Sequence, residues 1–102
     1  MKFDDKVSGA TERSARAPLS IACEARQGMQ PWQRVRLNDL SPQGFQVTWK
    51  APINPRQVLR LRIPGMAPLS AHIRWHDKHV LGCEFQAPLH VAVFDHIVRG
   101  AG

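Results

Sequence analysis

The sequence has few of the residues on which small catalytic and metal sites depend. It contains two cysteines and eight acidic residues, against fourteen lysines and arginines. Cys23 and Cys83 lie far apart, and no Cys-x-x-Cys spacing occurs, so a zinc site and a structural disulfide are both poorly supported. We expect both cysteines to be small buried hydrophobic residues.

Long hydrophobic runs are also lacking. Residues 1–10 are polar and do not include the apolar core of a signal peptide, and no stretch has the length of a membrane span. A chain of 102 residues can bury one core and little more. We therefore expect a cytoplasmic protein without membrane insertion, in which a flexible tail (residues 1–10) precedes one domain (residues 11–99).

Neither an enzyme nor a metal site is indicated. Ser41 and the two cysteines are possible nucleophiles, but no Gly-x-Ser-x-Gly elbow and no recognisable base partner accompany them. His72, His76 and His79 are close in sequence, and the first two share a face of a predicted strand, yet further metal ligands are absent nearby. We expect a protein without catalytic residues, metal or cofactor.

Arginine, in contrast, is abundant. Ten arginines and four lysines give a formal net charge of +6. The planar guanidinium group suits bidentate contact with phosphates and with guanine edges. This composition indicates an anionic, nucleotide-like partner, although a basic balance also occurs on ordinary soluble surfaces.

Alternating apolar and polar residues indicate six short strands separated by turn residues. The expected strands cover residues 19–26, 32–39, 45–50, 58–63, 69–76 and 80–85. Six strands at short, regular spacing predict a closed antiparallel barrel or a sandwich. After Pro88 the period becomes helical, and a helix there can cap an open end of a barrel. Its apolar stripe is expected to comprise Leu89, Ala92, Val93, His96 and Ile97.

The three tryptophans raise a separate possibility, because exposed aromatic rings can stack on the bases of single-stranded nucleic acid. Trp49 and Trp75 have the parity of apolar strand neighbours and are expected in the core. Trp32 has the parity of Arg34 and Arg36, and its exposure is left open.

A short polar segment, Asp39-Leu40-Ser41-Pro42-Gln43-Gly44, connects the second and third expected strands. Proline fixes φ, serine and aspartate bond their own backbone, and glycine permits positive φ or a close approach, so a hairpin turn accounts for these residue types. A functional interpretation comes from their combination with Arg13 and Arg16, which lie just before the first expected strand.

In combination and order, these motifs resemble the PilZ domain, the receptor module for cyclic di-GMP. Family members carry an Arg-x-x-x-Arg loop, a Pro-hydrophobic strand start, Asp/Asn-x-Ser-x-x-Gly, a strand resembling Val-x-Trp, and Gly-x-x-Phe. The resemblance spans roughly residues 12–98. The matching segments are Arg16-Ala17-Pro18-Leu19, the set Asp39, Ser41 and Gly44, Ile73-Arg74-Trp75, and Gly82-Cys83-Glu84-Phe85.

The resemblance implies a six-stranded antiparallel β-barrel with a C-terminal α-helix, and a non-enzymatic receptor that signals to an effector protein still to be identified. It implies that Arg13 and Arg16 contact phosphates or guanines, that Asp39 accepts from guanine N1 and N2, and that Ser41 donates to phosphate or base. Gly44 would let the ligand lie against the turn. DNA and RNA are not expected partners.

One position departs from the family pattern. When Arg16 is aligned with the second motif arginine, Glu12 occupies the position of the first, and Arg13 is one residue out of register. In an extended segment a shift of one residue turns a side chain to the opposite side. The alternative is therefore a PilZ-like protein-interaction module that has lost nucleotide binding. A third possibility is a basic barrel that binds single-stranded nucleic acid.

Overall fold

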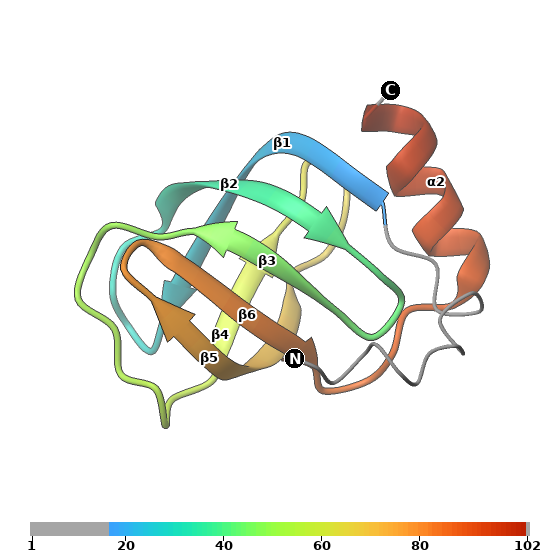
Figure 1. Cartoon of the computed structure of the whole chain (residues 1–102). Coiled ribbons are helices and arrows are strands. Elements are labelled where there is room, and N and C mark those ends of the chain that lie inside the picture. The colour runs from blue at the N-terminus through green and yellow to red at the C-terminus, as the bar shows by residue number, and fades with distance from the viewer. Residues whose placement is uncertain (1–16, 102) are drawn as a thin grey trace.

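The computed structural model describes residues 17–101. The expected tail (residues 1–10) and two predicted ligand residues, Arg13 and Arg16, lie outside the described residues. Within them, six strands are followed by one helix (Figure 1). The elements are β1 (Ala17–Gln27), β2 (Gln33–Leu40), β3 (Gly44–Thr48), β4 (Leu59–Arg62), β5 (Leu69–Asp77), β6 (Val80–Phe85) and α2 (Val91–Ala101).

The six strands form a closed barrel in the order β1-β2-β3-β6-β5-β4, and all neighbouring strands are antiparallel. The β1–β4 pair completes the closure, so no edge strand remains among these six. This confirms the predicted barrel. Figure 1 shows the β2–β3 turn and α2 at one end of the barrel, and the β1–β2 turn and the β3–β4 connection at the other.

The core consists of the inward-facing residues of all six strands, as the alternation predicts. Cys23 and Cys83 are both buried and unbridged, in agreement with the expectation that they act as small hydrophobic residues. Phe45 and Phe85 pack with ring centroids 5.1 Å apart. Other fully enclosed core residues are Leu37, Leu40, Val47, Leu59, Leu61 and Leu81.

The predicted apolar stripe of the helix is confirmed in part. Ile97 is buried, and Leu89 and Val93 pack against the core, as predicted. Ala92 and His96 are exposed instead, and Phe94 and Val98 pack on the barrel. The physical reason is that Phe94 and Val98 remove more apolar surface from water than a small alanine and a polar histidine would. The ring nitrogen Nδ1 of His90 accepts a hydrogen bond from the Ala92 amide at 2.9 Å, which satisfies one donor at the start of the helix.

Trp75 is not a core residue, and this part of the sequence prediction is wrong. The pairing of β5 with β6 shifts between Ile73 and Trp75, where β5 contains one extra residue. Such a bulge reverses the side-chain alternation. Trp75 consequently lies outside, 43% exposed, across from Gly82, and the face predicted to be shared by His72 and His76 is broken as well.

Gln27 is the buried polar residue of the described core, with 1% of its surface exposed. Its amide nitrogen donates to the carbonyl oxygens of Asn54 and Gln57 at 2.8 and 3.0 Å, and its side-chain oxygen accepts from the Asn54 amide at 3.0 Å. All these partners lie in the connection between β3 and β4. The side chain thus attaches that irregular segment to the end of β1 without leaving a buried polar atom unsatisfied.

Candidate functional site

The predicted ligand residues of the β2–β3 region lie where β1 enters the barrel. Ala17 pairs with Leu40, and Pro18 pairs with Asp39. Arg16 directly precedes Ala17 in the sequence but lies outside the described residues, as does Arg13. The structure therefore brings the described end of the arginine-bearing segment next to the Asp39–Gly44 turn.

A β-bulge determines which way Asp39 faces. Leu37 pairs with Val47 and Asp39 pairs with Gln46, so Asn38 is an extra residue on β2. Without the extra residue, Asp39 would face inward like Leu37. Residues directly opposite each other in a sheet share a face, so Asp39 faces outward together with Gln46. The side-chain amide of Asn38 donates to the hydroxyl of Thr48 at 3.0 Å, which stabilises the bulge. The carboxylate of Asp39 is in this way kept out of the core.

Ser41 organises the turn through its backbone and its hydroxyl. Its amide donates to the Gly44 carbonyl oxygen at 2.9 Å, and its Oγ accepts from the amides of Gln43 and Gly44 at 3.3 and 3.2 Å. The hydroxyl proton is directed toward the Gly44 carbonyl oxygen, 3.4 Å away. Because that last contact is long and the carbonyl already has a donor, the proton can turn toward a ligand at little cost.

Backbone hydrogen bonds from the end of β6 and from the segment after it also hold the turn. The Pro42 carbonyl accepts from the Leu89 amide, and the Gln43 carbonyl accepts from the Phe85 amide, each at 2.8 Å. These bonds connect the turn to the end of β6 and to the segment that leads into α2. We call the start of β1 and the β2–β3 turn the rim. The turn is a fixed part of this rim rather than a projecting loop.

Gly44 is required by the fold. It has an ordinary negative φ, and a Cβ added to it would lie 2.1 Å from the carbonyl oxygen of Cys83 on β6. Of the two roles open to this glycine, close approach is the one that the structure requires. The neighbour is the β6 backbone, and this packing explains the residue without reference to a ligand.

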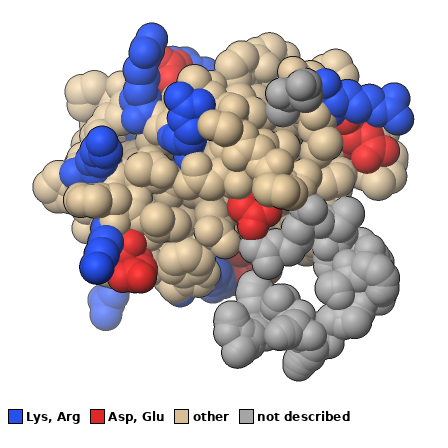
Figure 2. All heavy atoms as spheres, turned by 45° about the horizontal axis from the view of Figure 1, so that its top comes forward, with Lys and Arg blue, Asp and Glu red and all other residues tan. Residues whose placement is uncertain are grey.

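The described part of the motif contributes Asp39, Ser41 and Gly44 but no cation. A ligand carrying phosphates would therefore need positive charge from elsewhere, and Arg13 and Arg16 are the nearest arginines in sequence to the start of β1. Figure 2 shows that most of the basic side chains on the visible face gather over its left half, with acidic side chains beside some of them.

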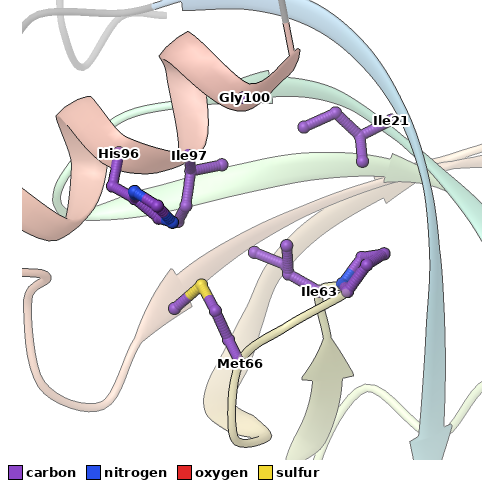
Figure 3. Close-up of a pocket in the computed structure, with 7 residues that line it drawn as sticks. Ile21, Ile63, Met66, His96, Ile97 and Gly100 are labelled. Atoms are coloured by element: carbon purple, nitrogen blue, oxygen red, sulfur yellow. The ribbon is translucent and has the colours of Figure 1, made fainter.

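A cavity of about 250 Å³ lies between α2 and the barrel, at the same end as the turn (Figure 3). Ile21 of β1, Ile63 and Met66 of the β4–β5 connection, and Ile97 of α2 line it, with His96 as a polar neighbour. None of the described ligand residues contributes to its wall. An apolar cavity of this kind does not suit a doubly charged nucleotide.

Sequence reasoning missed one cluster outside this rim. Trp32, whose exposure the pattern left open, is half-buried and contacts two guanidinium groups. The central guanidinium carbons of Arg26 and Arg62 lie 4.7 and 4.1 Å from the centre of its ring. Arg62 also forms an ion pair with Glu24 at 2.6 Å. The shared outward parity of Trp32, Arg34 and Arg36 was a signal in the sequence that Trp32 lies on a basic surface. Its partners, Arg26 on β1 and Arg62 on β4, could not be predicted, because they depend on which strands are neighbours in the barrel.

Nucleophilic and metal chemistry have little support in the described residues. Burial raises the pKa of Cys83 to about 12, and burial, partly offset by Arg36, raises that of Cys23 to about 11. Both thiols are therefore protonated near neutral pH. In residues 17–101, no three His, Cys, Asp or Glu side chains are grouped to hold a metal ion, and no helix there has the length and apolarity to cross a membrane.

Comparison with known families gives a match that covers most of the chain. The family model described as the PilZ domain matches residues 10–101. No curated protein matches the sequence.

Proposed function

The chain belongs to the PilZ family, whose members are non-catalytic receptor modules, and from this premise we propose that it is a receptor for cyclic di-GMP. The ligand would sit at the rim formed by the start of β1 and the β2–β3 turn. Ligand binding would draw residues 11–16, which precede β1, over the ligand and present a new surface to an effector protein.

The observation that carries the proposal is the pairing of Pro18 with Asp39 and of Ala17 with Leu40. It brings the end of the arginine-bearing segment to a carboxylate on the outer face and to a hydroxyl whose proton can be redirected. Guanidinium groups supply what cyclic di-GMP phosphates and guanine O6 and N7 require, and the Asp39 carboxylate accepts from guanine N1 and N2.

Calorimetric titration with cyclic di-GMP tests this assignment. Arg16→Ala removes a charge-assisted contact worth about 1.5–3 kcal/mol, which weakens affinity by roughly 10- to 150-fold. Arg99→Ala, an exposed arginine on α2, is the matched control and is expected to bind like the unmodified chain. Equal heats for all three proteins would exclude the site, and comparable heats with GTP would exclude the selectivity.

The second candidate is a PilZ module that works through protein contacts alone. Glu12 favours it, because a carboxylate stands at the position of the first motif arginine. Glu12→Arg discriminates between the two functions. If the unmodified chain binds no cyclic di-GMP and the variant gains binding, the second candidate is favoured; if the unmodified chain already binds, the receptor assignment stands.

A further inference from the structure

Five arginines lie on the outer face of three neighbouring strands. We call this set the arginine face: Arg26 on β1, Arg34 and Arg36 on β2, and Arg60 and Arg62 on β4. Arg34, Arg36 and Arg60 are exposed, and the other two are half-buried. The face extends along the barrel wall toward the β1–β2 turn, at the end opposite the Asp39–Gly44 turn (Figure 1).

Strand register places these charges close together. Arg26 lies directly opposite Arg60, and Glu24 lies between Arg34 and Arg62. Like charges directly opposite each other in a sheet are destabilising. From Ala22 to Gln27 of β1 and at the positions paired with them, Glu24 is the one acidic residue that faces outward, so the face has four positive charges in excess. The outward-facing Asp39 lies at the other end of the β1–β2 pair. A fold that keeps such an arrangement has a surface complementary to a polyanion.

Nucleic acid is disfavoured by the geometry of Trp32. Sequence-tolerant binding of single strands depends on aromatic rings that stack on bases. Here two guanidinium groups lie over the Trp32 ring, 4.7 and 4.1 Å from its centre, and a base would have to compete with them for contact with that ring.

A membrane surface is disfavoured by the scarcity of apolar side chains there. The exposed large hydrophobic residues of the described chain are Met29, Trp75 and Val91, and only Met29, in the β1–β2 turn, borders the arginine face. One methionine adds little of the apolar area on which interfacial binding depends. Arginine forks, in contrast, match carboxylates in a bidentate manner.

We propose that the arginine face docks an acidic segment of a partner protein, one rich in aspartate and glutamate. The contact lies away from the Asp39–Gly44 rim and does not depend on cyclic di-GMP binding. It therefore gives the module a partner surface whether or not the receptor assignment holds.

Fluorescence anisotropy with a fluorescein-labelled peptide of ten glutamates tests the proposal on the ligand-free full chain. The double variant Arg34→Gln/Arg60→Gln is expected to bind roughly 5- to 30-fold more weakly, as the loss of two exposed ion pairs implies. Lys78→Asn/Arg99→Gln removes the same charge from exposed positions in the β5–β6 turn and on α2, and should leave affinity within about twofold once screening by salt is matched. Circular dichroism verifies folding, and the single variants replace the double one if it does not fold.

Three results would overturn the proposal. The first is an absence of peptide binding at low ionic strength. The second is an equal loss in both double variants, which would show a net-charge effect. The third is a labelled ten-nucleotide thymidine strand, or vesicles containing phosphatidylglycerol, binding more tightly than the peptide with the same dependence on Arg34 and Arg60.

Discussion

Two glycines of the family motifs, Gly44 and Gly82, make different contacts. A Cβ on Gly44 would meet the backbone carbonyl of Cys83, which cannot move without disturbing the β3–β6 ladder. A Cβ on Gly82 would meet the indole of Trp75, 2.2 Å from its nearest atoms. Trp75 is partly exposed, so its ring has room to move outward.

We therefore expect Gly44→Ala to be the more damaging substitution. Overpacking against a fixed backbone should lower the free energy of unfolding by about 1–3 kcal/mol. Gly82→Ala should lower the free energy of unfolding by less, because the Trp75 side chain can move aside whereas the backbone of the β3–β6 ladder cannot. Urea unfolding of both variants provides the measurement. Equal losses, or a larger loss for Gly82→Ala, would contradict this explanation of the motif.

At the scale of the elements, alternation predicts strands well because half-buried strands need it, and all six appear near their expected positions. Bulges defeat the same reasoning. Arg74 is the extra residue that places Trp75 outside, and Asn38 is the one that places Asp39 outside. Neither arginine nor asparagine marks a bulge in the sequence. The cause lies in the pairing of two strands, which a single strand's pattern does not contain.

The candidate site shows the same division. Turn chemistry predicts the Ser41–Gly44 turn, and the resemblance identifies its residues. The contacts of Pro42 and Gln43 with Leu89 and Phe85 depend on the path of the chain after β6 and have no sequence signal. Arg13 and Arg16 lie outside the described residues, and their roles remain predictions.

Gln27 provides a test of how a connection is held to the barrel. Gln27→Leu keeps the volume but removes three hydrogen bonds to Asn54 and Gln57. The loss of these bonds is expected to lower the free energy of unfolding by about 1–3 kcal/mol. It is not larger because Asn54 and Gln57 are exposed residues, so water can bond to their freed backbone groups. Gln86→Leu, at an exposed position, is the control and should change it by less than about 0.5 kcal/mol. A neutral Gln27→Leu would show that the connection does not depend on these bonds.

For the whole molecule, the buried thiols predict how stability depends on pH. Folding raises the pKa of Cys23 from 9.0 to about 11 and that of Cys83 from 9.0 to about 12. The unfolded chain therefore loses these protons first, so their contribution is complete below pH 9 and is lost as the pH rises from there toward 11 for Cys23 and toward 12 for Cys83.

Urea unfolding between pH 8 and 10 measures this effect. In the unmodified chain, the urea concentration at the midpoint of unfolding should decrease once the pH exceeds 9. The decline should be smaller in Cys23→Ala/Cys83→Ala, whose stability is lower at every pH because two core side chains are truncated. Parallel curves for the two proteins would mean that the thiols do not set the alkaline limit.

The barrel separates two surfaces: the rim at the start of β1 and the β2–β3 turn, and the arginine face that extends toward the β1–β2 turn. A receptor needs one place for its ligand and another for its partner. Because the turn is bonded to the end of β6 and to the segment before α2, ligand contact at the rim is also positioned to affect the helix.

The most direct test of the receptor assignment is a titration of the isotopically labelled chain with cyclic di-GMP, followed by the amide signals in two-dimensional NMR. The account predicts that the amides of Ser41, Gln43 and Gly44 shift, while that of Gln30, in the β1–β2 turn, stays in place. Unchanged turn signals at saturating ligand, or shifts confined to the β1–β2 turn, would contradict it.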